Sequence, residues 1–162
     1  MSLRILDIIE GTTVDGPGFR TAIYFAGCRH CCPGCHNPES WDFNSGSEVD
    51  IETLLKVISA NDMDVSLSGG DPVYQINDMI PLCRAIKNLG KTIWLYTGFT
   101  FEELWSLEKG KELIETVDVV VEGPYIESLR DTNLLFRGSS NQRLIVCPDS
   151  TPYNIKIWES DF

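Results

Sequence analysis

Short apolar runs alternate along the chain with stretches in which apolar residues recur every three or four positions. The short runs predict strands, and the three- and four-residue spacing predicts amphipathic helices. Ile5–Ile9 is expected to add an edge strand or a hairpin partner. Asp50 is expected to cap the first helix, and Gly110 to interrupt the last two helical pieces. The expected strands are 21–26, 65–68, 92–96, 117–121 and 143–146, and the expected helices are 51–60, 76–89, 101–107 and 111–116.

The alternation of strands and helices predicts an α/β fold in which helices pack on a mostly parallel sheet. Glycines follow four of the expected strands within one or two residues, at Gly27, Gly69-Gly70, Gly98 and Gly123. In parallel α/β folds, ligands bind beyond the carboxyl ends of the strands, where glycine lets a backbone approach them closely. The motifs that carry chemistry are therefore expected on one rim of the sheet. The length of 162 residues predicts a single domain over 1–162.

The formal net charge of −11, from 24 acidic and 13 basic residues, disfavours nucleic-acid binding, because an acidic surface repels phosphate backbones. No segment approaches the roughly 20 apolar residues that cross a bilayer. The first residues also lack the apolar run of a secretory signal. Clustered cysteines without such a signal indicate metal or redox chemistry in a reducing compartment. The sequence therefore predicts a cytoplasmic protein that binds neither nucleic acid nor membrane.

Three cysteines lie close together in the loop that follows the first core strand. Cys28, Cys32 and Cys35 form the spacing C-x3-C-x2-C. Three thiolates on one tight loop can hold three irons of a cubane cluster and leave the fourth iron without a protein ligand. Because iron–sulfur clusters usually have four cysteine ligands, this loop indicates a cluster that binds another molecule at its open iron. Cys31 falls outside the spacing and is interpreted as a non-ligand.

Zinc is the alternative metal for this loop, with Cys31, His30 or His36 as the fourth ligand. Zinc sites usually combine two separated ligand pairs, and a second pair is missing, which favours iron–sulfur. Cys83 and Cys147 are isolated in apolar surroundings and are interpreted as small buried hydrophobic residues. His30 is interpreted as a residue that orders the loop through a hydrogen bond.

The segment 68–72, Ser-Gly-Gly-Asp-Pro, ends the next core strand. Taken alone, it is typical of a turn, because Gly-Gly and Asp-Pro both favour turns. Next to the cysteine loop, its exposed backbone carbonyls could accept hydrogen bonds from an ammonium group. The segment therefore predicts either a plain turn or part of a ligand site.

The cysteine spacing resembles that of radical S-adenosylmethionine (SAM) enzymes. The segment 68–72 resembles the glycine-rich motif with which those enzymes hold the amino group of SAM. Residues 14–20 (VDGPGFR) and 35–41 (CHNPESW) look like the corresponding segments of the glycyl-radical-enzyme activases within that group. The first two motifs thus resemble those of SAM-binding enzymes in general, and the last two segments resemble those of enzymes that activate glycyl radical enzymes.

Three further segments resemble the branch of activases that acts on anaerobic (class III) ribonucleotide reductases. They are 94–98 (WLYTG), 118–125 (DVVVEGPY) and 137–143 (RGSSNQR), so the resemblance covers most of the chain. His36 departs from this branch, which often has tyrosine there, and matches the branch that acts on pyruvate formate-lyase.

The resemblance implies an incomplete, open (β/α) barrel of mostly parallel strands that carries a [4Fe-4S] cluster and SAM. The amino and carboxylate groups of SAM would chelate the fourth iron. The implied cluster ligands are Cys28, Cys32 and Cys35. The implied SAM contacts are Gly34, Cys35 and His36 near the adenine, and Ser68, Gly69, Gly70 and Asp71 near the methionine part.

The implied reaction is reductive cleavage of SAM at the cluster, after which a 5′-deoxyadenosyl radical generates a glycyl radical on an anaerobic ribonucleotide reductase. The implied electron donor is a protein such as reduced flavodoxin, and no catalytic side chain is needed. The alternatives are activation of another glycyl radical enzyme such as pyruvate formate-lyase, or a non-catalytic iron–sulfur or zinc-binding module. Loop 137–143 is expected to contact a ligand or partner, and the turn 15–18 to shape the entrance. A chain this short leaves little sequence to close a pocket over SAM, so the reductase is expected to complete an open face.

Overall fold

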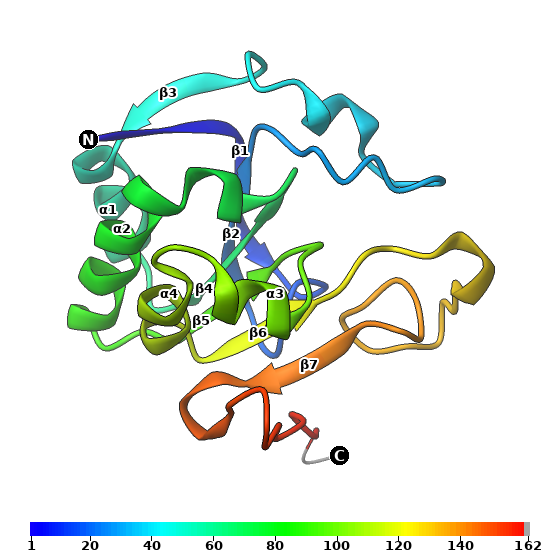
Figure 1. The fold of residues 1–162 in the computed structure, drawn as a ribbon. Coiled ribbons are helices and arrows are strands. Elements are labelled where there is room, and N and C mark those ends of the chain that lie inside the picture. The colour runs from blue at the N-terminus through cyan, green and yellow to red at the C-terminus, as the bar shows by residue number, and fades with distance from the viewer. Residues whose placement is uncertain (161–162) are drawn as a thin grey trace.

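One open sheet of seven strands forms the centre of the molecule, in the order β3-β1-β2-β4-β5-β6-β7 (Figure 1). This computed structural model describes residues 1–160. Within those residues the two edge strands do not pair with each other, so the sheet does not close. The strands are β1 (Ser2–Thr12), β2 (Arg20–Phe25), β3 (Ser47–Asp50), β4 (Asp64–Gly69), β5 (Ile93–Tyr96), β6 (Val119–Glu122) and β7 (Arg143–Val146).

The middle of the sheet is parallel and its flanks are antiparallel. β2, β4, β5 and β6 run parallel to one another, whereas β1, β3 and β7 each join through antiparallel pairs. The prediction of an α/β fold is confirmed, with the parallel pairing limited to these four strands. β1 is the expected hairpin partner of β2, but it is not an edge strand. β3 covers its other side and is missed by the sequence, because SEVD contains only one apolar residue.

The four α-helices gather on one side of the sheet (Figure 1). The predicted cap is confirmed, since the carboxylate of Asp50 accepts a hydrogen bond of 2.7 Å from the Thr53 N–H. The prediction for Gly110 is wrong: it is the first residue of a helix. A Cβ atom there would lie 1.7 Å from the Leu104 carbonyl oxygen, so the close packing of α3 against α4 requires glycine. The helices are α1 (Ile51–Ser59), α2 (Ile76–Asn88), α3 (Phe101–Ser106) and α4 (Gly110–Thr116).

The main core lies between these helices and the sheet. Ile23, Leu67, Leu95 and Val120 sit on four neighbouring parallel strands, and each is at most 1% exposed. Burying a side chain of this size stabilises a fold by roughly 1.5–3 kcal/mol, so the alternation of side chains fixes which sheet face receives the helices. No helix in residues 1–160 is both long enough and apolar enough to cross a membrane.

A second, smaller core covers part of the opposite sheet face. Trp94, Val119, Val121 and Leu144 are buried there, and Trp158 from the C-terminal segment packs on them. That segment extends the sheet at the β7 edge, where the Trp158 N–H donates to the Leu144 carbonyl at 2.7 Å. The smaller core leaves the remainder of this sheet face uncovered, and the candidate site lies there.

Candidate active-site cleft

The cysteine loop, residues 26–37, connects β2 to the short 3-10 helix η1 (Pro38–Trp41). Figure 1 shows it in light blue, reaching out beyond the end of β2. Two backbone hydrogen bonds hold its base: the Gly27 N–H donates to Ser40 O at 2.7 Å, and the Asp71 N–H donates to Gly27 O at 2.8 Å. The loop is therefore anchored to the glycine-rich segment that follows β4, as expected for motifs on one rim.

The three predicted cluster ligands differ from the fourth cysteine of the loop in their burial. Cys28, Cys32 and Cys35 are free and partly buried, whereas Cys31 is exposed. Burial raises the pKa of the Cys28 thiol to about 11, and the nearby thiols of Cys32 and Cys35 act in the same direction. The three thiols therefore lie within electrostatic reach of one another, and each must lose its proton to bind iron.

The donor set of this loop has the chemistry of a cluster site. Among residues 1–160, no three His, Cys, Asp or Glu side chains are grouped so that they could hold one metal ion. The thiols are thus not arranged around one zinc ion in this structure. A cubane cluster has a different requirement, because each cysteine binds its own iron atom. Three separate thiols on one anchored loop meet that requirement.

Asp71 holds the cysteine loop to the end of β5. Its carboxylate is fully buried, and its Oδ2 lies 2.6 Å from Nε2 of His30. The same oxygen accepts hydrogen bonds from Thr97 Oγ1 at 2.8 Å and from the Gly98 N–H at 2.9 Å. The interpretation of His30 as a loop-ordering residue is confirmed. Asp71 positions the loop from behind and does not line the cleft described below.

The two glycines at the end of β4 allow backbone segments to approach each other. A Cβ atom at Gly69 would lie 2.3 Å from the Phe25 amide nitrogen, and one at Gly70 would lie 2.5 Å from the Gly27 carbonyl oxygen. Real Cβ atoms do not approach other atoms this closely, so a side chain at Gly69 would push β2 away, and a side chain at Gly70 would push the cysteine loop away. The two glycines therefore have a structural role, which is to let the neighbouring backbone segments pack closely. Gly69 also lines the cleft described below.

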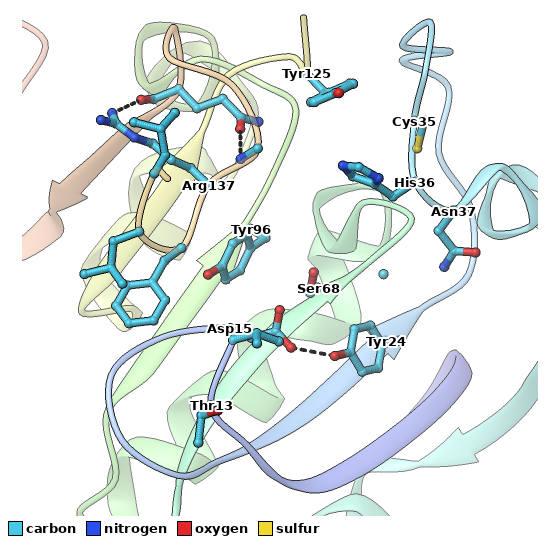
Figure 2. Close-up of a pocket in the computed structure, with 17 residues that line it drawn as sticks. Thr13, Asp15, Tyr24, Cys35, His36, Asn37, Ser68, Tyr96, Tyr125 and Arg137 are labelled. Atoms are coloured by element: carbon cyan, nitrogen blue, oxygen red, sulfur yellow. Dashed lines mark hydrogen bonds between the residues drawn. The ribbon is translucent and has the colours of Figure 1, made fainter. Parts of the chain in front are cut away.

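A cleft of about 640 Å³ opens on the sheet face opposite the helices, beside the cysteine loop (Figure 2). Its volume is within the range of small-molecule sites, roughly 300–1,000 Å³. The lining residues come from six parts of the chain: Thr13, Val14 and Asp15; Tyr24; Cys35, His36 and Asn37; Ser68 and Gly69; Tyr96; and Tyr125, Leu134, Leu135, Phe136, Arg137, Gly138 and Gln142.

Strand register places three hydroxyl side chains in one row on the floor of this cleft. Tyr24 pairs with Ser68 across β2 and β4, and Tyr96 lies beside Ser68 because the preceding residues of β4 and β5 pair. The residue directly before each of these three on its strand points to the opposite face of the sheet, into the main core. Tyr24 and Tyr96 are not predicted as site residues from the sequence, since only the register of the sheet brings them together.

The turn before β2 is anchored to this floor by two polar side chains. The Tyr24 hydroxyl donates to Oδ2 of Asp15 at 2.5 Å, and the Ser66 hydroxyl donates to the Asp15 backbone carbonyl. Arg20, which is 1% exposed, donates from Nε to Ser66 Oγ at 2.9 Å. Burial lowers the pKa of Arg20. Asp15 thereby reaches the cleft wall, and the role of its turn at the entrance stays a prediction.

The loop between β6 and β7 forms the wall opposite the β1–β2 turn, and its polar motif mainly braces it. Gln142 Oε1 accepts hydrogen bonds from the N–H groups of Gly138 (2.9 Å) and Ser139 (3.2 Å), and Gln142 Nε2 donates to Gly123 O (3.0 Å). Asn141 Nδ2 donates to Pro124 O at 2.7 Å. These bonds hold the backbone of the motif against the end of β6.

The final arginine of this motif forms ion pairs, one of them with the last residue of β6. Arg143 contacts the buried carboxylate of Glu122 through Nε at 3.1 Å and through Nη2 at 2.9 Å, and it also contacts Glu102. The hydrogen bond to Glu122 is the main reason that the pKa of Arg143 is raised. Of the predicted ligand or partner loop, only Arg137, Gly138 and Gln142 reach the cleft.

The cleft brings together four of the seven predicted SAM contacts, from two separate loops: Cys35, His36, Ser68 and Gly69. Gly34, Gly70 and Asp71 do not line it. The interpretation of the two isolated cysteines is confirmed, since Cys83 is 0% and Cys147 is 3% exposed. Burial raises the pKa of each to about 12.

Comparison with known proteins covers the part of the chain that carries these residues. The family model of a 4Fe-4S single cluster domain matches residues 14–145. Curated relatives named anaerobic ribonucleoside-triphosphate reductase-activating protein are 38% identical in Salmonella typhimurium and 37% in Escherichia coli, over 80% of this chain and 89% of theirs. That of Enterobacteria phage T4 is 35% identical over 91% of this chain and 93% of its own. The crystal structure of QueE from Escherichia coli shares the fold, with a TM-score of 0.51 and 22% identity over 62% of this chain and 54% of QueE.

Proposed function

Because the chain belongs to the family of anaerobic ribonucleoside-triphosphate reductase-activating proteins, we propose that it activates an anaerobic ribonucleotide reductase. When bound, a [4Fe-4S] cluster and SAM supply a one-electron cleavage whose radical product takes a hydrogen atom from a glycine Cα of the reductase. The observation that carries this proposal is the position of the cysteine loop, whose Cys35 and His36 form one wall of an open cleft.

Cys28, Cys32 and Cys35 hold the cluster in this proposal. Their partial burial and common loop support the assignment, as does the anchoring of that loop through Asp71. Cys31 stays outside the ligand set because it is exposed. These residues would position the cluster, and the cofactors would supply the chemistry.

SAM lies in the cleft between the cysteine loop and the end of β4. Cys35 and His36, with Gly34 behind them, contact the adenine, and Ser68 and Gly69 contact the methionine part. Gly70 and Asp71 act one step away, because they hold the cysteine loop against β4. The size of the cleft supports this assignment.

The reductase completes the site from outside. The sheet is an incomplete barrel in this proposal, and the missing wall is supplied by a glycine-bearing segment of the partner. A donor such as reduced flavodoxin supplies the electron. The acidic balance of the chain supports a protein that binds no nucleic acid, and its clustered free cysteines support a cytoplasmic location. We take residues 1–162 to act as one domain.

The test is electron paramagnetic resonance of the anaerobically reconstituted protein, mixed with SAM, a reductant and a candidate partner. A glycyl radical should form on an anaerobic ribonucleotide reductase and not on pyruvate formate-lyase. His36 is the residue that favours the second partner, since formate-lyase activases have histidine there. A radical on pyruvate formate-lyase alone would reassign the partner. Loss of SAM cleavage in a protein with a full cluster would refute the proposed function.

A further inference from the structure

Tyr96 carries a buried hydroxyl group that the fold does not use. Its oxygen is shielded from solvent and has no hydrogen-bond partner among residues 1–160, although its ring lines the cleft. Figure 2 shows the side chain in the middle of the cleft, between the Arg137 loop on one side and Ser68 and the Asp15–Tyr24 pair on the other. A buried polar group without a partner is costly, so its retention in a ligand cleft needs a reason.

The neighbouring tyrosine of the same row is different. The Tyr24 hydroxyl donates to Asp15 at 2.5 Å, so its hydrogen-bonding capacity is used within the fold. Tyr24 and Tyr96 lie on either side of Ser68 in the row, on the same face of the sheet. The unpaired hydroxyl is thus a property of one position and not of the cleft floor as a whole.

The surroundings of Tyr96 decide which kind of ligand atom suits it. Burial is the main cause of its raised pKa. Asp15 acts in the same direction and outweighs Arg20, which acts against it, so the phenol stays protonated and can donate a hydrogen bond. An anionic ligand atom at this place would meet the negative charge of Asp15. A neutral oxygen acceptor avoids that repulsion.

We propose that Tyr96 is a ligand-binding residue whose phenol donates a hydrogen bond to a neutral oxygen in the occupied cleft. This inference rests on the proposed function and names two sources of such an oxygen: a ribose hydroxyl of SAM, and a peptide carbonyl of the glycine-bearing segment. Both offer the same chemistry at this depth of the cleft.

The experiment compares Tyr96→Phe with Tyr24→Phe and Tyr153→Phe in the anaerobically reconstituted protein. Thermal unfolding is measured without SAM, SAM affinity by calorimetry without the reductase, and the KM for the reductase by glycyl radical formation. Tyr153 is 97% exposed and serves as the neutral control. Tyr24→Phe should lower the melting temperature, because it leaves the Asp15 carboxylate without its partner.

Tyr96→Phe should keep or raise the melting temperature of the SAM-free protein, because it removes an unpaired buried hydroxyl. It should also weaken one binding step by roughly three- to tenfold, the usual effect of losing one neutral hydrogen bond. Weaker SAM binding identifies the ribose, and a raised KM for the reductase with normal SAM binding identifies the peptide carbonyl. A lower melting temperature, or wild-type values for both binding steps, would overturn the proposal. The SAM measurement stands even if the partner is a different glycyl radical enzyme.

Discussion

At the scale of single residues, Asp71 links two loops that are far apart in the sequence. One oxygen of its carboxylate is hydrogen-bonded to His30, Thr97 and the Gly98 N–H. The other oxygen accepts a hydrogen bond of 3.0 Å from the Val73 N–H. A fully buried carboxylate with this many partners both stabilises the fold and sets the place of the cysteine loop.

Asp71→Asn should therefore destabilise the protein, because the amide group cannot accept hydrogen bonds from all of these donors. We expect a loss of about 2 kcal/mol in the free energy of unfolding, measured by urea denaturation under anaerobic conditions. Asp62→Asn is the matched control, since Asp62 is exposed. An unchanged free energy of unfolding in Asp71→Asn would show that these contacts are not formed.

The cysteine loop permits a test of its ligand set one residue at a time. Cys28→Ala, Cys32→Ala and Cys35→Ala should each lose most of the iron and sulfide that reconstitution introduces, since each removes the ligand of one iron. Cys31→Ala should keep about four irons per chain, because its exposed thiol binds none. Iron and sulfide analysis checks both expectations. Cluster loss in Cys31→Ala with retention in Cys32→Ala would show that the register of the motif is different.

A functional residue can be predicted from the sequence where the residues that act together are close in the chain. Cys28, Cys32 and Cys35 lie on one loop, so their spacing alone indicates the cluster. Tyr24 and Tyr96 come together only through the pairing of β2, β4 and β5, which no local pattern reveals. The contacts of these two tyrosines therefore had to come from the structure.

At the scale of elements, the β6–β7 loop depends on its polar motif for its shape. Gln142→Ala should leave the overall fold intact and loosen the segment that carries Arg137 and Gly138, because three hydrogen bonds of Gln142 are lost. Limited proteolysis with trypsin should then cut faster at Arg137. Asn133→Ala lies in the same loop on an exposed side chain and should leave the cutting rate unchanged. Equal cutting rates in all three proteins would argue against the brace.

The elements that the sequence predicts well are those with a strong apolar period. The four parallel strands and four helices belong to this group, and their ends differ from expectation by a few residues at most. β3 escapes prediction because a short polar strand is held by pairing with β1 and not by its own burial. Gly110 is misread for a related reason, since its role depends on a carbonyl group in another helix.

At the scale of the whole molecule, the C-terminal segment packs through Trp158 against a residue that lines the cleft. Trp158 packs edge-on against Trp94, with ring centroids 4.9 Å apart, and lies 5.9 Å from Phe136, which lines the cleft. Trp158→Ala should cost about 2 kcal/mol of unfolding free energy, less than for a fully buried tryptophan because Trp158 is partly exposed. It should also weaken SAM binding through Phe136. Tyr153→Ala, in the same segment but 97% exposed, should change neither quantity.

The separation of the six cysteines has a consequence for a protein that meets oxygen. Cys83 and Cys147 are enclosed in the main core with pKa values near 12, so their thiols offer almost no reactive thiolate at neutral pH. The other four lie together on the cysteine loop. Oxidation after loss of the cluster is thus confined to one loop at the surface, where the resulting disulfides are within reach of cellular reductants. We therefore expect the core to stay unaltered by oxidation, and the protein to take up iron and sulfide again once the loop is reduced.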